Sequence, residues 1–600
     1  MTVRRVRGAT VGVATALVAG LVLVPVTGAN GAGASNGPSF QRVSADPITG
    51  SDARVARAVV RSPGSVVGAA SARVAVSKKI QILQVWTGLQ GAGSNGLSVA
   101  AGPRQVVQAT GLSIRAFVKS TGATPKGGNK TLLQFFKLSS PVAVSQPDVV
   151  YDPVGKRFVA VAVADNSGDI GVVMRISKGT AAAPLKGKKW LPPVEFAFST
   201  STIEEPGRID VDESKPLVGV TSDKIVVTTV ADDPNDAAVA NRVFLFPKAP
   251  YYAGDDSFGG WAASVNSTYD GQAPAVNETK QANAFVAIPD TDDVTVTTYT
   301  GAAKDKAPQF SKNVVFPANP LNPPTPVTQT GGNTLDPGDL AFTGVDWRSN
   351  KLYAAATVNA SGRNAVRVFG INTGSGVSLA SDNTRKSSTA DWFSPDLAID
   401  GAGNVLVVAN DEGTVDGPSL AVFARKGSKW LAPRFIAKAS GVAFPGGGTT
   451  DWWNSTGAAL DPRSPWDVWV SGAVGDSGVP VTGLSSRVAR VSVAKNAASV
   501  KTSASAVNRG ARVKFTAKLT RPGGDTIRGL PVALQRKPVN GGKWTTVGSK
   551  KTKANGTATW TLRVQQAGLY RTLGKGVSQS GGQGVGFDKV ASPSKRVRLR

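Results

Sequence analysis

The sequence predicts an all-β protein, and three observations carry this prediction. Short runs rich in Val, Thr and Ile recur through the middle of the 600-residue chain, bounded by Gly, Pro, Asn or Asp. Such runs are typical of strands, and examples are 157–164, 224–230 and 404–410. No long segment shows the apolar period of an amphipathic helix. Beyond Lys495 the strand-like runs continue in a more basic composition, which indicates a second β-domain.

Histidine and cysteine are absent from the chain. Their absence excludes Ser-His-Asp triads, Cys-His pairs, histidine-ligated metal centres, thiolate zinc sites and disulfides. Hydrophobic residues make up 41% of the sequence and charged residues 18%. This composition is sufficient for a large buried core and is unlike that of a disordered chain.

The net charge of +28 is unevenly distributed along the chain. Residues 1–80 include 10 basic and 2 acidic residues, and residues 81–494 include 36 of each. Residues 495–600 include 22 basic and 2 acidic residues. The sequence therefore describes a neutral body with cationic ends rather than a uniformly basic protein.

The N-terminus has the three parts of a secretory signal peptide. Three arginines precede an apolar run at 11–26, and small residues follow the run. The run is short for a membrane-spanning helix, and no second long apolar stretch exists. We therefore expect residues 1–34 to be a signal peptide and residues 35–78 a flexible leader. The mature protein is expected to be secreted, with no integral membrane span.

One unit recurs through the middle of the chain: an apolar strand ending in Asp, a turn, and a second apolar strand. Its turn aspartates are Asp152, Asp212, Asp346, Asp400 and Asp461, and two weaker copies centre on Gly102 and Asn277. The seven units follow one another at intervals of about 60 residues, as expected of a β-propeller with large blades. Each Asp is expected to accept backbone N–H bonds in its turn. Residues 79–495 are thus predicted to form a seven-bladed β-propeller.

Two further features support the propeller. A Gly-x-Lys-Trp-Leu motif occurs twice, and its tryptophans, Trp190 and Trp430, are expected to cover seams between blades. The strand-like run 79–86 can complete the last blade beside 487–494. Such pairing between the two ends of the domain would close the ring.

The segment PDLAIDGAGNVLVVAND at 395–411 resembles the strand-turn-strand core of NHL-type and related six- to seven-bladed propellers. The other units match this core loosely. The Ser-x-Asp-x-Gly-x-Thr-Trp turn of the sialidase aspartate box is missing.

Residues 496–600 predict an immunoglobulin-like β-sandwich, because short alternating strands fill this segment and an Asn-Gly pair at 555–556 marks a hairpin. The pattern from NRG at 508–510 to AGLYR at 567–571 resembles the disulfide-free Ig-like repeats of secreted actinobacterial proteins. The resemblance implies a spacer or adhesion module.

Ligands of propellers usually bind at loops where strands from every blade converge. Two neighbouring blades begin with similar segments that place aromatic rings beside carboxylates. Flat apolar rings with neighbouring acceptors suit sugar rings, although packing between blades is the alternative role for the tryptophans. The candidate ligand-binding residues are Asp391, Trp392, Asp451, Trp452, Trp453, Glu204 and Glu205.

No catalytic site is assigned. A glycosidase needs two suitably spaced carboxylates, and nothing in the sequence selects Glu204 with Glu205, or Glu205 with Asp451, as such a pair. No cofactor is expected. Calcium stays open, because Asp-rich turns at 165–169 and 289–293 offer oxygen ligands, but neither turn has the EF-hand spacing.

Basic residues alternate along two C-terminal strands, and alternation places side chains on one face of a strand. We expect these residues to form a cationic sheet face: Arg512, Lys514 and Lys518, and Arg596, Arg598 and Arg600. Weak attachment to an acidic envelope polymer is the functional interpretation, and a solubilising face is the alternative. Export argues against a specific nucleic-acid partner.

These observations predict a secreted, monomeric, non-catalytic binding or adhesion protein of the cell surface. The propeller face is expected to bind glycans or other envelope polymers, and the cationic module is expected to associate with the wall. Two alternatives stay open: a secreted glycan-active hydrolase or lyase that uses propeller carboxylates, and a structural envelope protein.

Overall fold

The computed structural model describes most of the chain from residue 76 onward and two short segments before it. The described residues are 41–43, 46–47, 76–90, 96–139, 142–166, 169–185, 189–196, 212–232, 239–255, 260–267, 273–277, 281–301, 308–329, 331–413, 417–445, 448–479, 482–494, 497–520, 526, 529–574 and 590–600. The expected signal peptide lies outside them, and so do Glu204 and Glu205.

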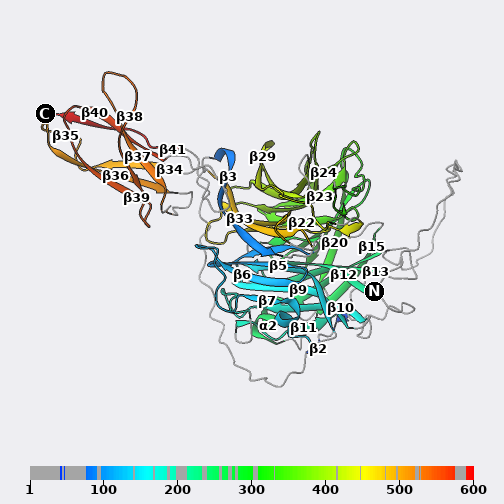
Figure 1. Cartoon of the computed structure of the whole chain (residues 1–600). Coiled ribbons are helices and arrows are strands. Elements are labelled where there is room, and N and C mark those ends of the chain that lie inside the picture. Colours follow the sequence, from blue (N-terminus) through cyan, green and yellow to red (C-terminus); the bar gives the residue numbers. More distant parts are fainter. Residues whose placement is uncertain are drawn as a thin grey trace. The chain divides into compact units, whose positions relative to one another are not determined.

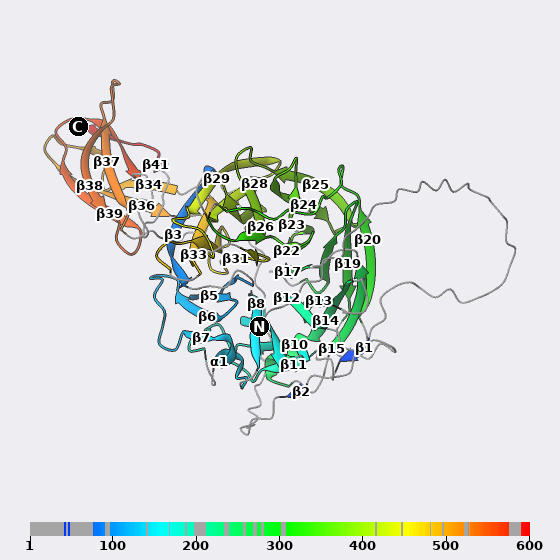
Figure 2. The same cartoon turned by 45° about the vertical axis from the view of Figure 1, so that its right-hand side comes forward.

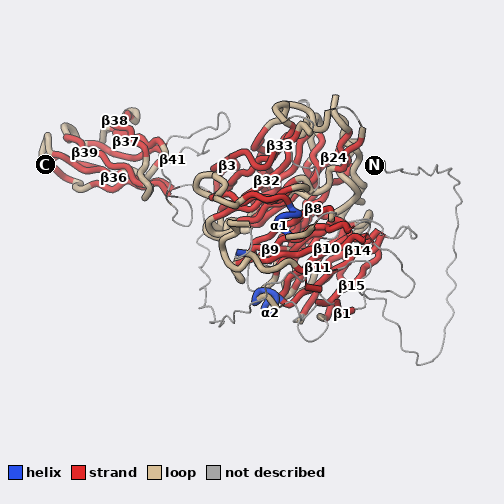
Figure 3. The backbone as a smooth tube through the Cα atoms, turned by 60° about the horizontal axis from the view of Figure 1, so that its bottom comes forward, coloured by secondary structure: helices blue, strands red, loops and turns tan. Residues whose placement is uncertain are grey.

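The described residues are almost entirely strands and turns, which confirms the all-β prediction (Figure 1; Figure 3). Two short helices, α1 (Leu132–Phe136) and α2 (Lys248–Ala253), lie between strands of the propeller. Within the described part of the chain, no helix is long and apolar enough to cross a membrane.

Seven sheets form the propeller within the described residues, and we number these blades in chain order. Blade 1 contains β4 (Ser98–Ala101), β5 (Gln105–Thr110), β6 (Ser113–Val118) and β7 (Asn129–Thr131). Blade 2 contains β8 (Ala143–Asp152), β9 (Arg157–Asn166), β10 (Asp169–Ile176) and β11 (Val194–Phe196). Blade 3 contains β12 (Asp212–Val220), β13 (Lys224–Asp232), β14 (Val239–Pro247) and β15 (Gly260–Ser267). Blade 4 contains β16 (Ala273–Pro274), β18 (Ala284–Pro289), β19 (Val294–Thr300) and β20 (Gln309–Val315).

The remaining three blades follow the same antiparallel order. Blade 5 contains β22 (Phe342–Arg348), β23 (Lys351–Asn359), β24 (Asn364–Asn372) and β25 (Ser378–Arg385), with β17 (Val276–Asn277) parallel to β22. Blade 6 contains β26 (Asp391–Ile399), β27 (Val405–Glu412), β28 (Ser419–Lys426) and β29 (Lys429–Ala437). Blade 7 contains β31 (Thr456–Leu460), β32 (Asp467–Gly475), β33 (Leu484–Ala494) and β3 (Val76–Gln90). A parallel pair, β21 (Thr334–Asp336) and β30 (Thr449–Asp451), links two connections between blades.

The ring is closed as the sequence predicts. Strand β3, from the N-terminal end of the domain, pairs antiparallel with β33 and completes blade 7. Trp86 of β3 lies opposite Val488 and packs against Trp469, with ring centroids 5.0 Å apart. Blade 7 therefore combines strands from the two ends of the propeller sequence, which closes the ring.

Part of the expected flexible leader is built into the propeller. Strand β1 (Gln41–Val43) pairs with β15 at the outer edge of blade 3. Strand β2 (Asp46–Pro47) pairs with β11 at the outer edge of blade 2. Residues 41–43 and 46–47 therefore add an outermost strand to each of two neighbouring blades.

The inner strands of neighbouring blades approach one another closely at glycines. A Cβ atom at Gly344 would lie 2.2 Å from the Asp396 carboxylate, and one at Gly457 would lie 2.8 Å from the Val99 backbone nitrogen. Glycine is required at such positions because any side chain would force the blades apart.

The C-terminal domain is a sandwich of two sheets around one core. The three-stranded sheet contains β34 (Ala497–Thr502), β36 (Arg512–Thr520) and β39 (Thr557–Arg563). The other sheet contains β35 (Ala506–Val507), β42 (Lys595–Leu599), β40 (Gly568–Gly574), β37 (Pro531–Lys537) and β38 (Thr545–Lys551), with β41 (Val590–Ala591) beside β40. Phe515 and Trp560 from the first sheet share the core with Leu534 and Tyr570 from the second. This arrangement is the predicted immunoglobulin-like sandwich.

Candidate functional site

The inner strands of the blades surround the centre of the ring (Figure 2). Residues from the inner strands of all seven blades line a central channel there. Its free volume is about 70 Å³. Sites for small molecules usually have volumes of about 300–1,000 Å³. The channel therefore has room for a few water molecules but not for a sugar ring, and its polar groups serve the ring itself.

Three aspartates of the channel join neighbouring blades: the buried Asp148 on β8 and Asp346 on β22, and the half-buried Asp396 on β26. One carboxylate oxygen of each accepts the N–H of the following residue. The other accepts an N–H from the inner strand of the next blade. These bonds run from Val218 to Asp148 (2.7 Å), from Ile399 to Asp346 (2.7 Å) and from Ala458 to Asp396 (2.6 Å).

Burial dominates the electrostatics of Asp148 and Asp396. Desolvation raises the pKa of Asp148, although hydrogen bonds from Ser98, Val218 and Val149 oppose the shift. Desolvation also holds the pKa of Asp396 well above its ordinary value, and the charge of Asp148 adds to this rise. Both oxygens of each carboxylate are occupied by N–H donors, so these aspartates act as bridges between blades.

The predicted turn role is confirmed for three aspartates, which accept backbone N–H bonds inside the first turn of their blade. Asp152 accepts from Val154 at 2.8 Å and from Gly155 at 2.9 Å. Asp400 and Asp461 accept equivalent bonds in blades 6 and 7.

The turn assignment is wrong for Asp212 and Asp346. Strand β12 begins at Asp212, and the turn of blade 3 comes later, where Thr221 Oγ1 accepts the N–H of Lys224 at 2.9 Å. In blade 5, Ser349 and Asn350 both have positive φ and form a two-residue turn, so β22 extends beyond Asp346. The Asp346 side chain consequently bridges blades in the channel.

Two turn aspartates also bind a lysine from the next blade. Lys248 forms an ion pair with Asp152 at 2.8 Å, and Lys119 forms one with Asp461 at 2.9 Å. Burial tends to raise the pKa of Asp461, but Lys119 and Arg490 outweigh it and lower that pKa below its ordinary value. The same turn thus shapes one blade and holds its neighbour.

Trp190 and Trp430 lie at seams between blades, as predicted. Trp190 is buried and meets Phe135 of α1 edge-on, with ring centroids 4.8 Å apart, in the core shared by blades 1 and 2. Arg385, at the end of blade 5, lies 5.7 Å above the ring of Trp430 in blade 6.

The three tryptophans among the candidate ligand-binding residues are buried. Trp452 is 0% exposed and donates to Asn410 Oδ1 at 3.1 Å, and Trp453 is 3% exposed beneath Lys215. Trp392 is 6% exposed, packs on Phe423 and donates to Asp411. Of the three, Trp392 alone borders a described cavity large enough for a ligand.

The two candidate carboxylates that the structure describes belong to different strands. Asp391 begins β26, where it binds Arg363 at 3.0 Å and accepts the N–H of Asn364 at 2.7 Å. Asp451 is exposed at the end of β30, opposite Asp336 of β21. Glu204 and Glu205 lie outside the described residues, so their place beside either aspartate is untested.

A groove opens on blade 6, at the end of the ring where inner strands begin. Four strand ends meet there, because the blade is antiparallel: β26 and β28 start at this edge, and β27 and β29 finish at it. The groove has a volume of about 300 Å³. Its lining comprises Ser387, Thr389, Ala390, Trp392, Asp411, Gly413, Ser419, Pro433, Phe435 and Lys438. It lies at the lower end of the size range for small-molecule sites.

The groove combines one accessible ring with charges of both signs. Phe435 is 40% exposed, and Lys438 Nζ lies 5.3 Å from its ring centroid. Burial raises the pKa of Asp411, while the hydrogen bond from Trp392 and the charge of Lys438 act in the opposite direction. An apolar ring beside an acceptor and a donor can stack on the C–H face of a sugar and bind its hydroxyls.

Sequence reasoning found Trp392 but not Phe435, Asp411 or Lys438. In the sequence, Phe435 has the pattern of an ordinary apolar residue of an outer strand. Only the pairing of β28 with β29 shows that it lies at the groove. Among the described residues, no group of three or more Asp or Glu side chains is arranged to hold a metal ion.

The cationic residues of the sandwich lie on two sheets, which corrects the expectation of one charged face. Arg512, Lys514 and Lys518 belong to β36 of the three-stranded sheet. Arg596 and Arg598 belong to β42 of the other sheet, and Arg600 follows that strand. Both strands turn their alternate apolar residues into the common core, so the basic residues point outward in opposite directions.

No protein-family model matches the chain, and no curated protein matches it. Several solved structures resemble it weakly. A chain of the mitotic checkpoint complex is 9% identical with a TM-score of 0.34, and the match covers 74% of this chain and 100% of that one. A fungal alcohol oxidase of the AA5 family, in complex with copper, is 10% identical with a TM-score of 0.36, covering 86% and 99%. The exo-beta-1,3-galactanase from Phanerochaete chrysosporium is 11% identical with a TM-score of 0.28, covering 85% and 99%. Similarities of this size carry no argument about function, and the propeller rests on the sheet topology above.

Proposed function

We propose that the chain is an exported, non-catalytic carbohydrate-binding protein of the cell surface. The blade 6 groove binds the glycan, and the cationic sandwich attaches the protein to an anionic envelope polymer. The propeller blades are of the NHL type, and the sandwich is an Ig-like adhesion module of the kind found in secreted actinobacterial proteins.

The observation that carries the glycan site is the exposed ring of Phe435, which lines the groove together with Asp411 and Lys438. The candidate tryptophans are buried in packing contacts, whereas the ring of Phe435 lines a cavity that a monosaccharide unit can enter. The hydroxyls of Ser387 and Thr389 add further polar partners along the rim.

The test is a screen of the purified full chain on polysaccharides by affinity electrophoresis, followed by calorimetry on any ligand found. Phe435→Ala should weaken binding by up to about tenfold, because an aromatic stacking contact contributes about 0.5–1.5 kcal/mol. Phe316→Ala is the matched control, since Phe316 is 70% exposed after β20 of blade 4 and outside the groove. Equal binding by both variants would contradict the assigned groove.

A hydrolase or lyase is the second candidate, and the groove offers it one carboxyl group with a raised pKa, that of Asp411. A retaining or inverting glycosidase needs a second free carboxylate, whereas neighbouring Asp391 is bound to Arg363 and to the N–H of Asn364. We therefore expect no release of reducing ends from any bound polysaccharide. Turnover that disappears in Asp411→Asn would establish the enzyme instead.

A further inference from the structure

The outward face of the three-stranded sheet is a lattice of cations and hydroxyls. Strand β36 presents Arg512, Lys514 and Lys518, and its neighbours add Lys501 and Arg563. The positions between them are Ser499, Thr516, Thr557, Thr559 and Thr561. All five basic residues are exposed, and within the described residues no hydrogen bond or ion pair engages their side chains.

This face carries repulsion that folding alone does not explain. Arg512 lies directly opposite Arg563 in the register of β36 with β39. Like charges directly opposite one another destabilise a sheet. Since no Asp or Glu of this domain is described, the described residues supply no counter-charge to the pair. An external anion bound to this face would relieve the repulsion.

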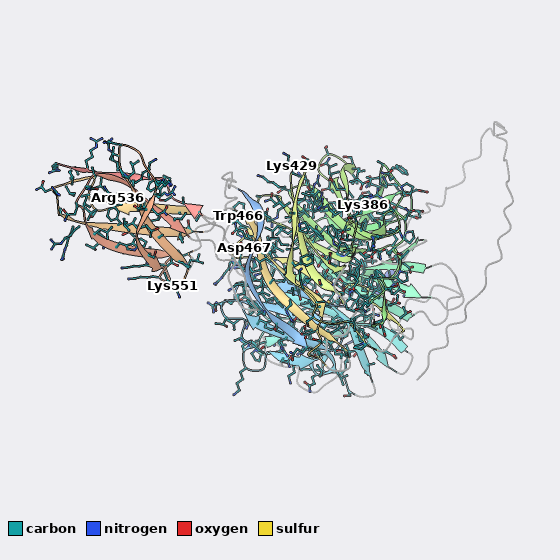
Figure 4. The ribbon with its side chains drawn as sticks, turned by 45° about the horizontal axis from the view of Figure 1, so that its top comes forward. Lys386, Lys429, Trp466, Asp467, Arg536 and Lys551 are labelled. Carbon is teal, nitrogen blue, oxygen red and sulfur yellow. The ribbon has the colours of Figure 1, made fainter. Side chains whose placement is uncertain are left out.

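The other sheet has a second cationic face. Arg596 of β42 lies opposite Leu569 of β40, and Arg571 of β40 lies opposite Gln535 of β37. Arg571 also lies 4.2 Å above the ring of Trp544, which holds its guanidinium on the sheet. Lys551 of β38 belongs to the same sheet (Figure 4).

Because the two sheets share one core, their outward faces look away from each other. We propose that the sandwich is a bivalent binder of linear phosphate-backbone polyanions, with one polymer segment on each face. This inference deepens the wall-attachment half of the proposed function and rests on it. A single domain would then cross-link two polymer chains rather than merely adhere to one.

Phosphate is favoured over carboxylate by the donors present. Arginine binds phosphate through two parallel N–H bonds, and hydroxyls donate to its remaining oxygens. Arg512 and Lys514 are two residues apart, about 7 Å along an extended strand. A polymer that repeats its charge at a similar interval can follow β36 from one cation to the next.

The experiment uses the full chain and inorganic polyphosphate of two lengths. Short polyphosphate, titrated calorimetrically, should bind with a stoichiometry of two, and long polyphosphate should produce cross-linked complexes visible by light scattering. Two variants of equal charge change separate the faces: Arg512→Gln/Lys514→Gln/Lys518→Gln and Arg571→Gln/Arg596→Gln/Arg598→Gln. Each should reduce the stoichiometry to one and abolish light scattering. Circular dichroism should be unchanged.

The proposal fails if one variant removes all binding and the other none, because only one face would then bind. It also fails if the wild-type chain binds a single short polymer. A combined six-residue variant should lose binding altogether, and retained binding would overturn the assignment of both faces.

Two further probes test the chemistry. Single-stranded DNA with a matched number of phosphates should bind about as tightly as polyphosphate, whereas binding to DNA alone would mean base recognition and overturn the proposal. Polygalacturonate should bind more weakly, and equal or tighter binding would overturn the phosphate assignment. Polyphosphate contains no sugar, so failure of the carbohydrate groove leaves these outcomes unaffected.

Discussion

The propeller and the sandwich use charge in opposite ways. In the propeller, the carboxylates that join blades are enclosed and matched, either by backbone N–H donors, as at Asp396, or by a lysine, as at Asp461. In the sandwich, cations such as Arg512 and Lys514 are exposed and lack partners within the described residues. Charge in the propeller therefore determines how blades join, whereas charge in the sandwich is available for a ligand. The two domains should respond differently to the same kind of mutation: loss of stability in one and loss of binding in the other.

The largest effect is expected where the ring closes. Trp86→Ala removes a buried ring that joins β3 to Trp469 and Phe117. Truncation of a buried aromatic residue costs about 3–5 kcal/mol of unfolding free energy. Urea unfolding should show this loss in the propeller transition. Leu112→Ala, at a position 63% exposed, is the control and should change stability by less than about 0.5 kcal/mol. Similar values for the two variants would mean that closure by β3 contributes little.

The next effect is expected in the channel. Asp396→Ala leaves the N–H groups of Leu397 and Ala458 without their acceptor. It should cost about 2 kcal/mol, because an unsatisfied buried donor carries a penalty of about 1–3 kcal/mol and both hydrogen bonds are partly buried. The exposed Asp292 of blade 4 supplies the control, Asp292→Ala. An equal loss in both variants, measured by urea unfolding, would show that the carboxylate does not bridge the blades.

The sequence predicts the ring, its closure and the turn role of Asp152, Asp400 and Asp461, because these depend on local patterns of strands and turns. It does not distinguish Asp346 from them, because the next strand begins at a similar interval: five residues after Asp152, Asp346 and Asp400, and six after Asp461. The difference arises from the two-residue turn at Ser349, which lengthens both strands of the hairpin.

The blade 6 groove could not be predicted from the sequence for a related reason. Its residues come from four strand ends of one blade, and burial alone separates the exposed Phe435 from the enclosed Trp452. Alternation along β36 and β42 was visible in the sequence, but the pairing that puts these strands in different sheets was not.

Acid titration should separate the two kinds of buried carboxylate. Burial raises the folded-state pKa of Asp396 above its unfolded value of about 3.9, so the folded state binds more protons between the two values and stability falls as pH rises through that interval. Asp396→Asn should remove this fall.

The pKa shift of Asp461 has the opposite sign: its lowered pKa gives stability above about pH 3.9 that is lost as pH falls through the folded-state pKa. Asp461→Asn should therefore flatten the acid limb. Melting temperature measured across about pH 3–8 checks both, and matching profiles for the two variants would contradict the assignment.

The smallest effect is expected in the sandwich, and its direction is the most informative. Arg563→Gln removes the like charge opposite Arg512 and should raise the stability of this domain by a few tenths of a kcal/mol at low salt. The same substitution should weaken binding of short polyphosphate to the three-stranded face. Salt near 1 M, where the screening length is about 3 Å, should abolish the stability gain and also release the full chain from anionic polymer.

Lys553→Gln is a matched control, because Lys553 is exposed in the hairpin turn and has no opposing cation in the register. These results together would show that the Arg512–Arg563 pair destabilises the free domain and strengthens its complex with the polyanion. If Arg563→Gln leaves stability unchanged and binding intact, the opposed arginines are only a solubilising feature.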